Sequence, residues 1–131
     1  MEGLKMHTIT DKIDAITLID DAHRVPAPPC PRSVKIELTA RCNFNCSFCA
    51  TGYNLRSKRD MDRNFYSRLL ADLREAGVEE VGMFYLGESF LLDWLPDAVA
   101  EAKDLGIPYV FLTTNGASAT PDKVQDCMEA G

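Results

Sequence analysis

The spacing of hydrophobic residues along the chain predicts three β-strands. Residues 33–39 (SVKIELT) alternate apolar and polar side chains, as in a strand that buries one face. Residues 81–86 and 107–112 form continuous apolar runs, which are typical of strands covered on both faces. All three segments are short enough to be strands, and each is followed by a polar or glycine-containing segment.

Each predicted strand is followed by a segment with the apolar spacing of a helix. The first helix is expected to begin at Asp60 or Asp62 and to end shortly before Gly77. A second helix is expected over residues 93–105. A third is expected after Thr120, whose side chain suits the position that caps a helix, and it is expected to run to about residue 130.

The order strand–helix, repeated three times, predicts an α/β fold with parallel strands joined by right-handed crossovers. In such folds the chemistry lies at the carboxyl ends of the strands. Three short motifs follow the three strands directly, namely TARCNFNCSFC, GES and TTNG. The sequence therefore places all its candidate functional loops at one end of the sheet.

The first 32 residues are expected to lie outside this α/β domain. A short helix over residues 11–22 fits the apolar spacing there, and the four prolines of residues 25–32 predict an extended linker. The domain itself is expected to span residues 33–131. A fourth strand is expected where the sequence stops at Gly131, so a C-terminal half of the barrel or a partner is expected to cover the sheet edge.

Composition narrows the classes of function and the compartment. The net charge of −6, from 14 basic and 20 acidic residues, argues against general binding of nucleic acids. No apolar run approaches the roughly 20 residues of a membrane-spanning helix, and the N-terminus lacks the apolar core of a secretion signal. Three of the five cysteines fall within eight residues, which favours a metal or catalytic role in a reducing cytoplasm over disulfides.

The strongest chemical signal is the spacing Cys42-x3-Cys46-x2-Cys49. Three thiolates on one short loop can bind three irons of a 4Fe–4S cluster and leave the fourth iron open to another ligand. An open metal position distinguishes a reactive site from a structural one. The alternative is a zinc-stabilised binding module with Cys30 as the fourth ligand, although a second CxxC pair, the usual partner in such sites, is missing.

The motifs together resemble the radical S-adenosylmethionine (radical SAM) superfamily. The segment IELTARCNFNCSFC is similar to that family's cluster loop, including the aromatic Phe48 before the last cysteine. Gly87 and Glu88 at the end of the second strand resemble its glycine–glycine–glutamate motif, and residues 113–116 (TTNG) recur in many members. The resemblance covers residues 33–131 and implies the first three βα units of a partial (β/α)6 TIM-like barrel.

The resemblance also implies a chemistry and a set of site residues. In this family a 4Fe–4S cluster binds S-adenosylmethionine at its open iron and cleaves it reductively, and the resulting 5′-deoxyadenosyl radical abstracts hydrogen from an organic substrate. Cys42, Cys46 and Cys49 would be the metal ligands. Phe48 would lie near the adenine, and the backbone around Gly87 would meet the methionine amino group. The residues expected to bind the cofactor are Phe48, Gly87, Glu88, Thr114 and Asn115.

Several of these assignments have simpler alternatives. Leu86 stands where the family motif usually has its first glycine, which weakens the assignment of the following Gly-Glu pair. Glu88 could be a helix cap or a solvated acid. Asn115 and Gly116 could form an ordinary turn, and Phe48 could be a packing residue.

The partners expected from the sequence are an organic substrate, in the class of a peptide or a natural product, and a flavodoxin-type electron donor. The latter rests on a basic stretch after the cysteine loop, for which a solvated surface is the alternative. This stretch contains Arg56, Lys58, Arg59 and Arg63.

Overall fold

The computed structural model describes residues 25–53 and 56–131. The expected helix at 11–22 lies outside these residues, and the proline-rich segment 25–32 is non-helical, as expected. Within the described parts, no helix combines the length and the apolar character needed to cross a bilayer. The strands are β1 (Ser33–Lys35), β2 (Glu80–Gly82) and β3 (Tyr109–Phe111), the α-helices are α2 (Arg63–Glu75), α3 (Leu95–Asp104) and α4 (Pro121–Ala130), and the short 3-10 helices are η2 (Ala50–Tyr53) and η3 (Ser89–Leu91).

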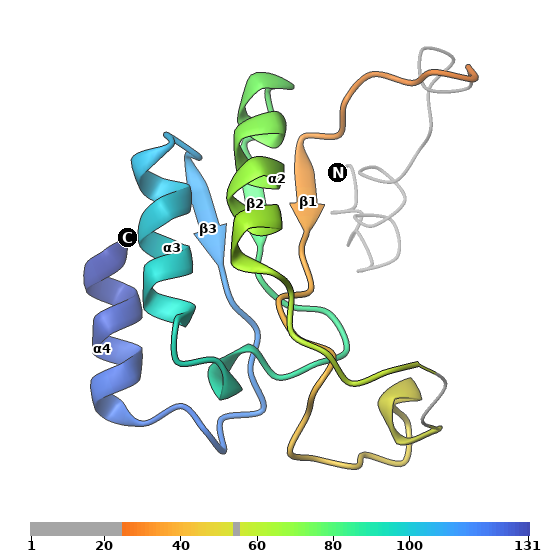
Figure 1. Cartoon of the computed structure of the whole chain (residues 1–131), viewed down its shortest axis with the longest axis vertical. Coiled ribbons are helices and arrows are strands. Elements are labelled where there is room, and N and C mark those ends of the chain that lie inside the picture. Colours follow the sequence, from red (N-terminus) through yellow and green to blue (C-terminus); the bar gives the residue numbers. More distant parts are fainter. Residues whose placement is uncertain (1–24, 54–55) are drawn as a thin grey trace, which may run out of the picture.

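The three strands form one parallel sheet in the order β1–β2–β3 (Figure 1). The register places Val34, Val81 and Val110 side by side. This arrangement confirms the predicted α/β fold with three consecutive βα units. Each strand is three residues long and therefore shorter than the predicted segments 33–39, 81–86 and 107–112. The remaining residues of these segments belong to the loops that flank the strands.

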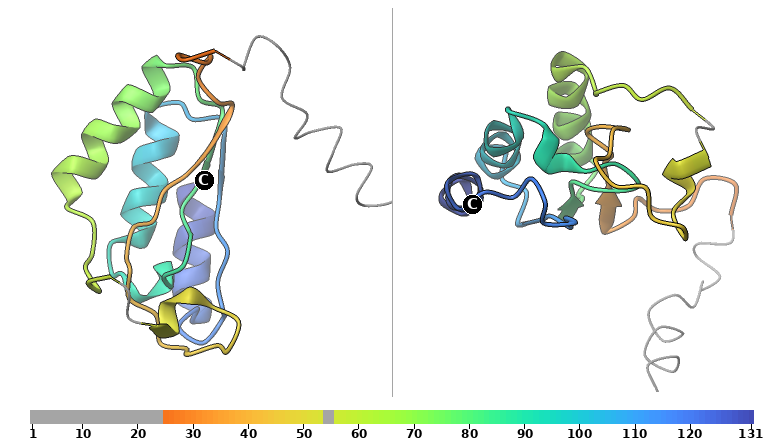
Figure 2. Two further views of the ribbon diagram at one scale, coloured as in Figure 1. Left: turned by 90° about the vertical axis from the view of Figure 1, so that its right-hand side faces the viewer. Right: turned by 90° about the horizontal axis from the view of Figure 1, so that it is seen from below.

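The sheet has one covered face and one open face. Alternate side chains of the first strand segment, among them Ile36 and Leu38, point into the core beneath the helices and are almost fully buried. Lys35 lies on the other face and is exposed. The two side views show α2 and α3 against one face of the sheet, with α4 beside α3 (Figure 2).

Local capping sets where the helices begin. The Asp62 carboxylate accepts the N–H of Phe65 at 2.9 Å and therefore caps α2, which decides between the two aspartates that the sequence offered. Thr120 caps α4 as predicted, with Pro121 in the first turn. The helix α3 begins two residues later than expected, at Leu95.

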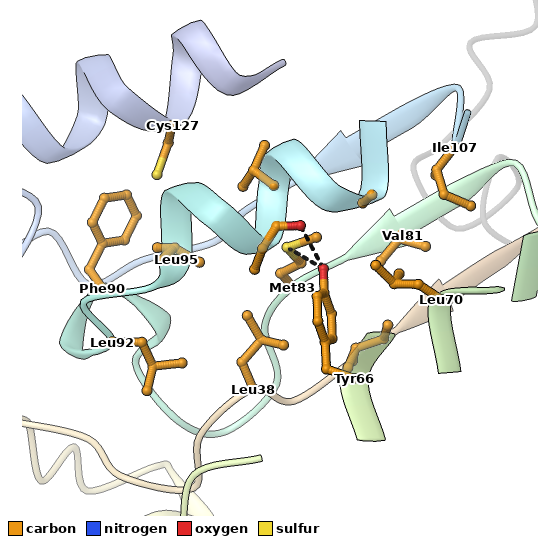
Figure 3. Packing of buried hydrophobic residues seen from close by; sticks show 14 of the residues in the cluster. Leu38, Tyr66, Leu70, Val81, Met83, Phe90, Leu92, Leu95, Ile107 and Cys127 are labelled. Atoms are coloured by element: carbon orange, nitrogen blue, oxygen red, sulfur yellow. Dashed lines mark hydrogen bonds between the residues drawn. The ribbon is translucent and has the colours of Figure 1, made fainter. Parts of the chain in front are cut away.

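A buried tyrosine connects α2 to α3 in the core. Tyr66 is 1% exposed, and its hydroxyl donates to the Ala98 carbonyl at 2.7 Å (Figure 3). The Met83 sulfur lies 3.8 Å from the same oxygen, and the Trp94 ring packs at a centroid distance of 5.6 Å. Burial raises the pKa of the Tyr66 hydroxyl far above its usual value, so this group stays protonated and remains a donor.

We predict that Tyr66→Phe lowers the free energy of unfolding by about 1 kcal/mol, because the substitution removes this hydrogen bond and leaves the ring in place. Urea denaturation followed by circular dichroism measures the change. Tyr109→Phe is the matched control, since its side chain is 57% exposed, and it is expected to unfold like the wild type. Equal destabilisation by both variants would contradict the role assigned to Tyr66.

Candidate cofactor site

The loops that follow the three strands meet at the carboxyl end of the sheet. In Figure 1 the arrows of β1, β2 and β3 point toward the same end, where the cysteine loop, η3 and the loop before α4 gather. Hydrogen bonds between residues more than 70 positions apart connect the cysteine loop to the last of these loops. The sequence motifs expected to form one site therefore do lie together.

The three cysteines occupy one partly exposed loop after β1. The N–H of Cys49 donates to the Cys46 carbonyl at 3.0 Å, which closes a turn between the second and third cysteine. The Cys42 sulfur accepts the Phe44 N–H at 3.4 Å, and the Asn115 side-chain amide approaches it at 3.7 Å. A shallow cavity of about 300 Å³ lies beside the loop. It is lined by Asn45, Cys46, Ser47, Cys49 and Tyr53.

Thr51 favours the ionised form of the third thiol. Its hydroxyl and its backbone N–H lie against the Cys49 sulfur, and they lower the pKa of that thiol, with a smaller contribution from the Arg56 charge. The Thr51 hydroxyl also donates to the Leu86 carbonyl at 3.0 Å, which connects the cysteine loop to the loop after β2.

The donors around these sulfurs suit an iron–sulfur cluster. N–H groups directed at thiolates stabilise their negative charge, and a soft three-thiolate loop matches the ligands that such clusters prefer. Within residues 25–53 and 56–131, no three Cys, His, Asp or Glu side chains converge as a preformed metal site. The zinc alternative gains no support, because the Cys30 thiol is exposed, and among the described residues its hydrogen bond is to the carbonyl of its neighbour Pro31.

Hydrogen bonds to Asp60 connect the two ends of the cysteine loop. Asp60, on the returning chain, accepts from the Thr39 hydroxyl at 2.6 Å and from the Arg41 guanidinium at 2.7 and 2.8 Å. The hydrogen bond from Arg41 keeps the pKa of the Asp60 carboxyl below its usual value. The backbone adds two bonds across the same junction, from Ala40 to the Arg59 carbonyl and from residue 61 to the carbonyl of residue 38.

Gly87 lies so close to the end of β1 that only glycine fits there. A Cβ atom at this position would be 1.8 Å from the Thr39 carbonyl oxygen and 3.0 Å from that of Arg41. The next residue adds a hydrogen bond, because the Glu88 N–H donates to the Arg41 carbonyl at 2.8 Å. The loop after β2 is therefore packed directly against the backbone that leads into Cys42.

Glu88 is the polar centre of the site, although it is 3% exposed. Its carboxylate accepts the Phe90 N–H at 3.0 Å, the Thr114 hydroxyl at 2.8 Å and the Asn115 N–H at 2.7 Å. Glu88 therefore does cap a helix, the short helix η3, which was one alternative considered for it. The other alternative, a solvated acid, is wrong because the residue is buried. Glu88 connects the loops after β2 and β3.

Asn115 joins the last loop to the cysteine loop. Its side-chain amide donates to the Asn43 side chain at 2.9 Å, and its side-chain oxygen accepts the Ala117 N–H. Gly116 has a φ of +81°, so a turn is present here as well. Phe48, by contrast, is 90% exposed, and the described residues give it no packing role.

Two residues of the site were missed by the sequence analysis or given a different role there. Glu37 lies in the segment that resembles the family's cluster loop but was assigned no role, yet its carboxylate accepts the backbone N–H groups of Leu86 and Gly87, each at 3.0 Å. Arg56, considered as part of a basic stretch for an electron donor with a solvated surface as the alternative, forms an ion pair with Glu37. Two signals pointed to Glu37: it belongs to the quoted segment IELTARCNFNCSFC, and it is an acidic residue between two buried apolar ones at the end of the predicted strand.

We predict that Glu88→Gln lowers the free energy of unfolding by about 1–3 kcal/mol, because an amide has one acceptor oxygen where the carboxylate has two, so that a donor of the neighbouring loop loses its partner at a buried side chain. Thermal and urea denaturation measure the loss. Glu75→Gln, an exposed glutamate at the end of α2, is the control and is expected to behave like the wild type. A stable Glu88→Gln variant would show that this carboxylate does not hold the loops together.

Several curated proteins are similar to this chain in sequence. Curated relatives include the PqqA peptide cyclase of Streptomyces rochei, 34% identical over 107 residues, which are 81% of this chain and 29% of that protein. The PqqA peptide cyclase of Xanthomonas oryzae pv. oryzae (strain MAFF 311018) is 37% identical over 106 residues, covering 80% of this chain and 28% of that protein. The chain thus spans less than a third of these relatives.

The fold is shared with a solved structure. The crystal structure of BtrN in complex with AdoMet and 2-DOIA matches with a TM-score of 0.71 and 22% sequence identity, over 76% of this chain and 42% of BtrN. This likeness confirms the predicted fold, three βα units of a partial TIM-like barrel. The model of the radical SAM superfamily matches residues 36–131, which are most of the chain. The chain therefore belongs to the radical SAM superfamily of enzymes.

Proposed function

We propose that the protein is a radical SAM enzyme that acts on a peptide, with a 4Fe–4S cluster held by Cys42, Cys46 and Cys49. The observation that carries this proposal is the family match over residues 36–131, which includes the cysteine loop and the two companion loops packed against it. The peptide substrate is supported by the identity of 34–37% to PqqA peptide cyclases. When bound, the cluster would supply the electron that cleaves S-adenosylmethionine and so generates a radical that abstracts hydrogen from the substrate.

The residues of this chain would hold and orient the cofactors. The three thiols would bind iron, and the donors at Cys42 and Cys49 would stabilise their negative charge. The backbone at Gly87 would receive the amino group of S-adenosylmethionine, and Glu88, Thr114 and Asn115 would fix that backbone against the cysteine loop. The exposed Phe48 ring is available to pack on the adenine.

The surroundings of the site are part of the same proposal. Thiolate ligands require a reducing compartment, which supports a cytoplasmic location.

Lys58 and Arg59 are exposed next to the cysteine loop, and among the described residues neither forms a salt bridge. They would suit contact with an acidic electron donor of the flavodoxin type. The proposed leader over residues 1–32 and core domain over 33–131 agree with a family match that begins at residue 36.

We predict that anaerobic reconstitution with iron and sulfide yields a brown protein with about four irons and four sulfides per chain. Cys42→Ala, Cys46→Ala and Cys49→Ala are each expected to lose most of the bound iron and the visible absorption band. Cys30→Ala and Cys127→Ala are the matched controls, because they remove a cysteine outside the loop, and they are expected to load normally. A colourless protein with one tightly bound zinc would instead identify a structural metal module.

We predict that the reconstituted whole protein forms 5′-deoxyadenosine from S-adenosylmethionine when dithionite is added, as measured by liquid chromatography. The triple variant with all three loop cysteines replaced by alanine is the control, and it is expected to form none because it lacks the cluster. A fully loaded wild-type protein that binds S-adenosylmethionine without cleaving it would contradict the proposed reaction.

A further inference from the structure

Glu37 contacts the loop after β2 more extensively than a surface carboxylate would. Its side chain is 18% exposed and follows Lys35 on the open face of the sheet. Its Oε1 atom accepts the N–H groups of both Leu86 and Gly87 at 3.0 Å. Arg56 binds the same carboxylate with two nitrogen atoms, one of them at 2.6 Å from Oε1. Partial burial opposes ionisation of Glu37, but these hydrogen bonds outweigh it and hold the pKa of the carboxyl below its usual value.

These contacts fix the orientation of the peptide groups around Gly87. The Gly87 N–H is held by Glu37, and its α-carbon is packed against the Thr39 carbonyl. The Glu88 N–H donates to the Arg41 carbonyl. In a trans peptide the N–H and the C=O point in opposite directions, so the Gly87 carbonyl points away from Arg41.

The Gly87 carbonyl is left available as an acceptor. Among the described residues, no donor forms a hydrogen bond to it. Backbone carbonyls in a protein are generally paired, and an unpaired one beside a candidate site is suited to a ligand with N–H donors. An ammonium group has three such donors. The Leu86 side chain takes no part in these contacts, which involve only its N–H and its carbonyl.

We infer that Glu37 is a positioning residue for S-adenosylmethionine: it holds the Leu86–Gly87 backbone so that the Gly87 carbonyl is presented to the ammonium group of the cofactor. The inference rests on the proposed function. Arg56 supports it by fixing the carboxylate in one geometry, because a paired arginine offers a planar, two-point contact. Glu37 itself does not touch the cofactor, so its effect would pass through the backbone.

The test uses Glu37→Ala and Glu37→Gln in the whole natural protein that contains these residues, after anaerobic reconstitution. Three quantities are measured: iron and sulfide per chain, the electron paramagnetic resonance spectrum of the reduced cluster with and without S-adenosylmethionine, and the Kd for S-adenosylmethionine by equilibrium dialysis. Glu79→Ala and Glu79→Gln are the matched controls, because Glu79 pairs with Arg32 just before the start of β2, at the opposite end of the sheet.

The expected result is normal iron and sulfide content in all variants. The Kd for S-adenosylmethionine is expected to rise about 10–100-fold in Glu37→Ala, as for the loss of a group that orients a ligand-binding group. Glu37→Gln is expected to lie between Glu37→Ala and the wild type, since its amide oxygen can still accept from the backbone but loses the arginine. The spectral change on adding the cofactor is expected to shrink in the same order, and the Glu79 variants are expected to match the wild type.

Wild-type affinity in a fully loaded Glu37→Gln and Glu37→Ala would overturn the inference while leaving the proposed function intact. If Glu37→Ala fails to fold or to load, Glu37→Gln decides by its affinity at full iron content. Loss of iron in both variants would also overturn the inference, because Glu37 would then serve the cysteine loop itself. A wild-type protein that takes up no iron, or no S-adenosylmethionine, would refute the proposed function and the inference with it.

Discussion

The burial of the Glu88 carboxylate is the constraint on which the site depends. A charged group without water is costly unless its oxygens are paired, and Glu88 is paired with donors from η3 and from the loop after β3. These donors can reach it only when the two loops lie together. Gly87 also packs the loop after β2 against the backbone at the end of β1. The carboxyl ends of all three strands are therefore held together by direct contacts. The position of Asn115 beside Cys42 follows from this arrangement.

The charged pairs of the protein differ greatly in what they can contribute. Arg63–Asp97 and Arg32–Glu79 are exposed on both sides, so solvent screens them and their effect on stability is small. Glu37–Arg56 and Asp60–Arg41 also bind backbone or hydroxyl groups at the base of the cysteine loop. These two pairs define geometry more than they add stability. The stability of the fold comes mainly from the apolar layer between the sheet and the helices.

The sequence was sufficient for the order of elements, the cysteine loop and the cap at Thr120, because each depends on residues close together in the chain. The parallel sheet pairs distant residues, but the alternation of strands and helices was sufficient to predict it. The sequence could not decide whether Asp60 or Asp62 caps α2. The decision depends on a distant residue, because the Asp60 carboxylate accepts from Arg41, 19 positions earlier in the chain. Glu37 was missed for the same reason, because its backbone partners are 49 and 50 residues distant. The leucine at position 86, which counted against the glycine motif, is tolerated because its contacts to Glu37 and Thr51 use backbone atoms alone.

The alternation along β1 has a consequence for how this segment can change during evolution. Ile36 and Leu38 face the core while Lys35 and Glu37 face the open side, and the backbone of the next residues supports Gly87. A side-chain period of two means that inserting or deleting a single residue here would exchange the faces. Glu37 would enter the apolar layer, and the cysteine loop would lose its alignment with the glycine. Homologous chains are therefore expected to vary in length beyond Cys49 rather than between residues 33 and 42.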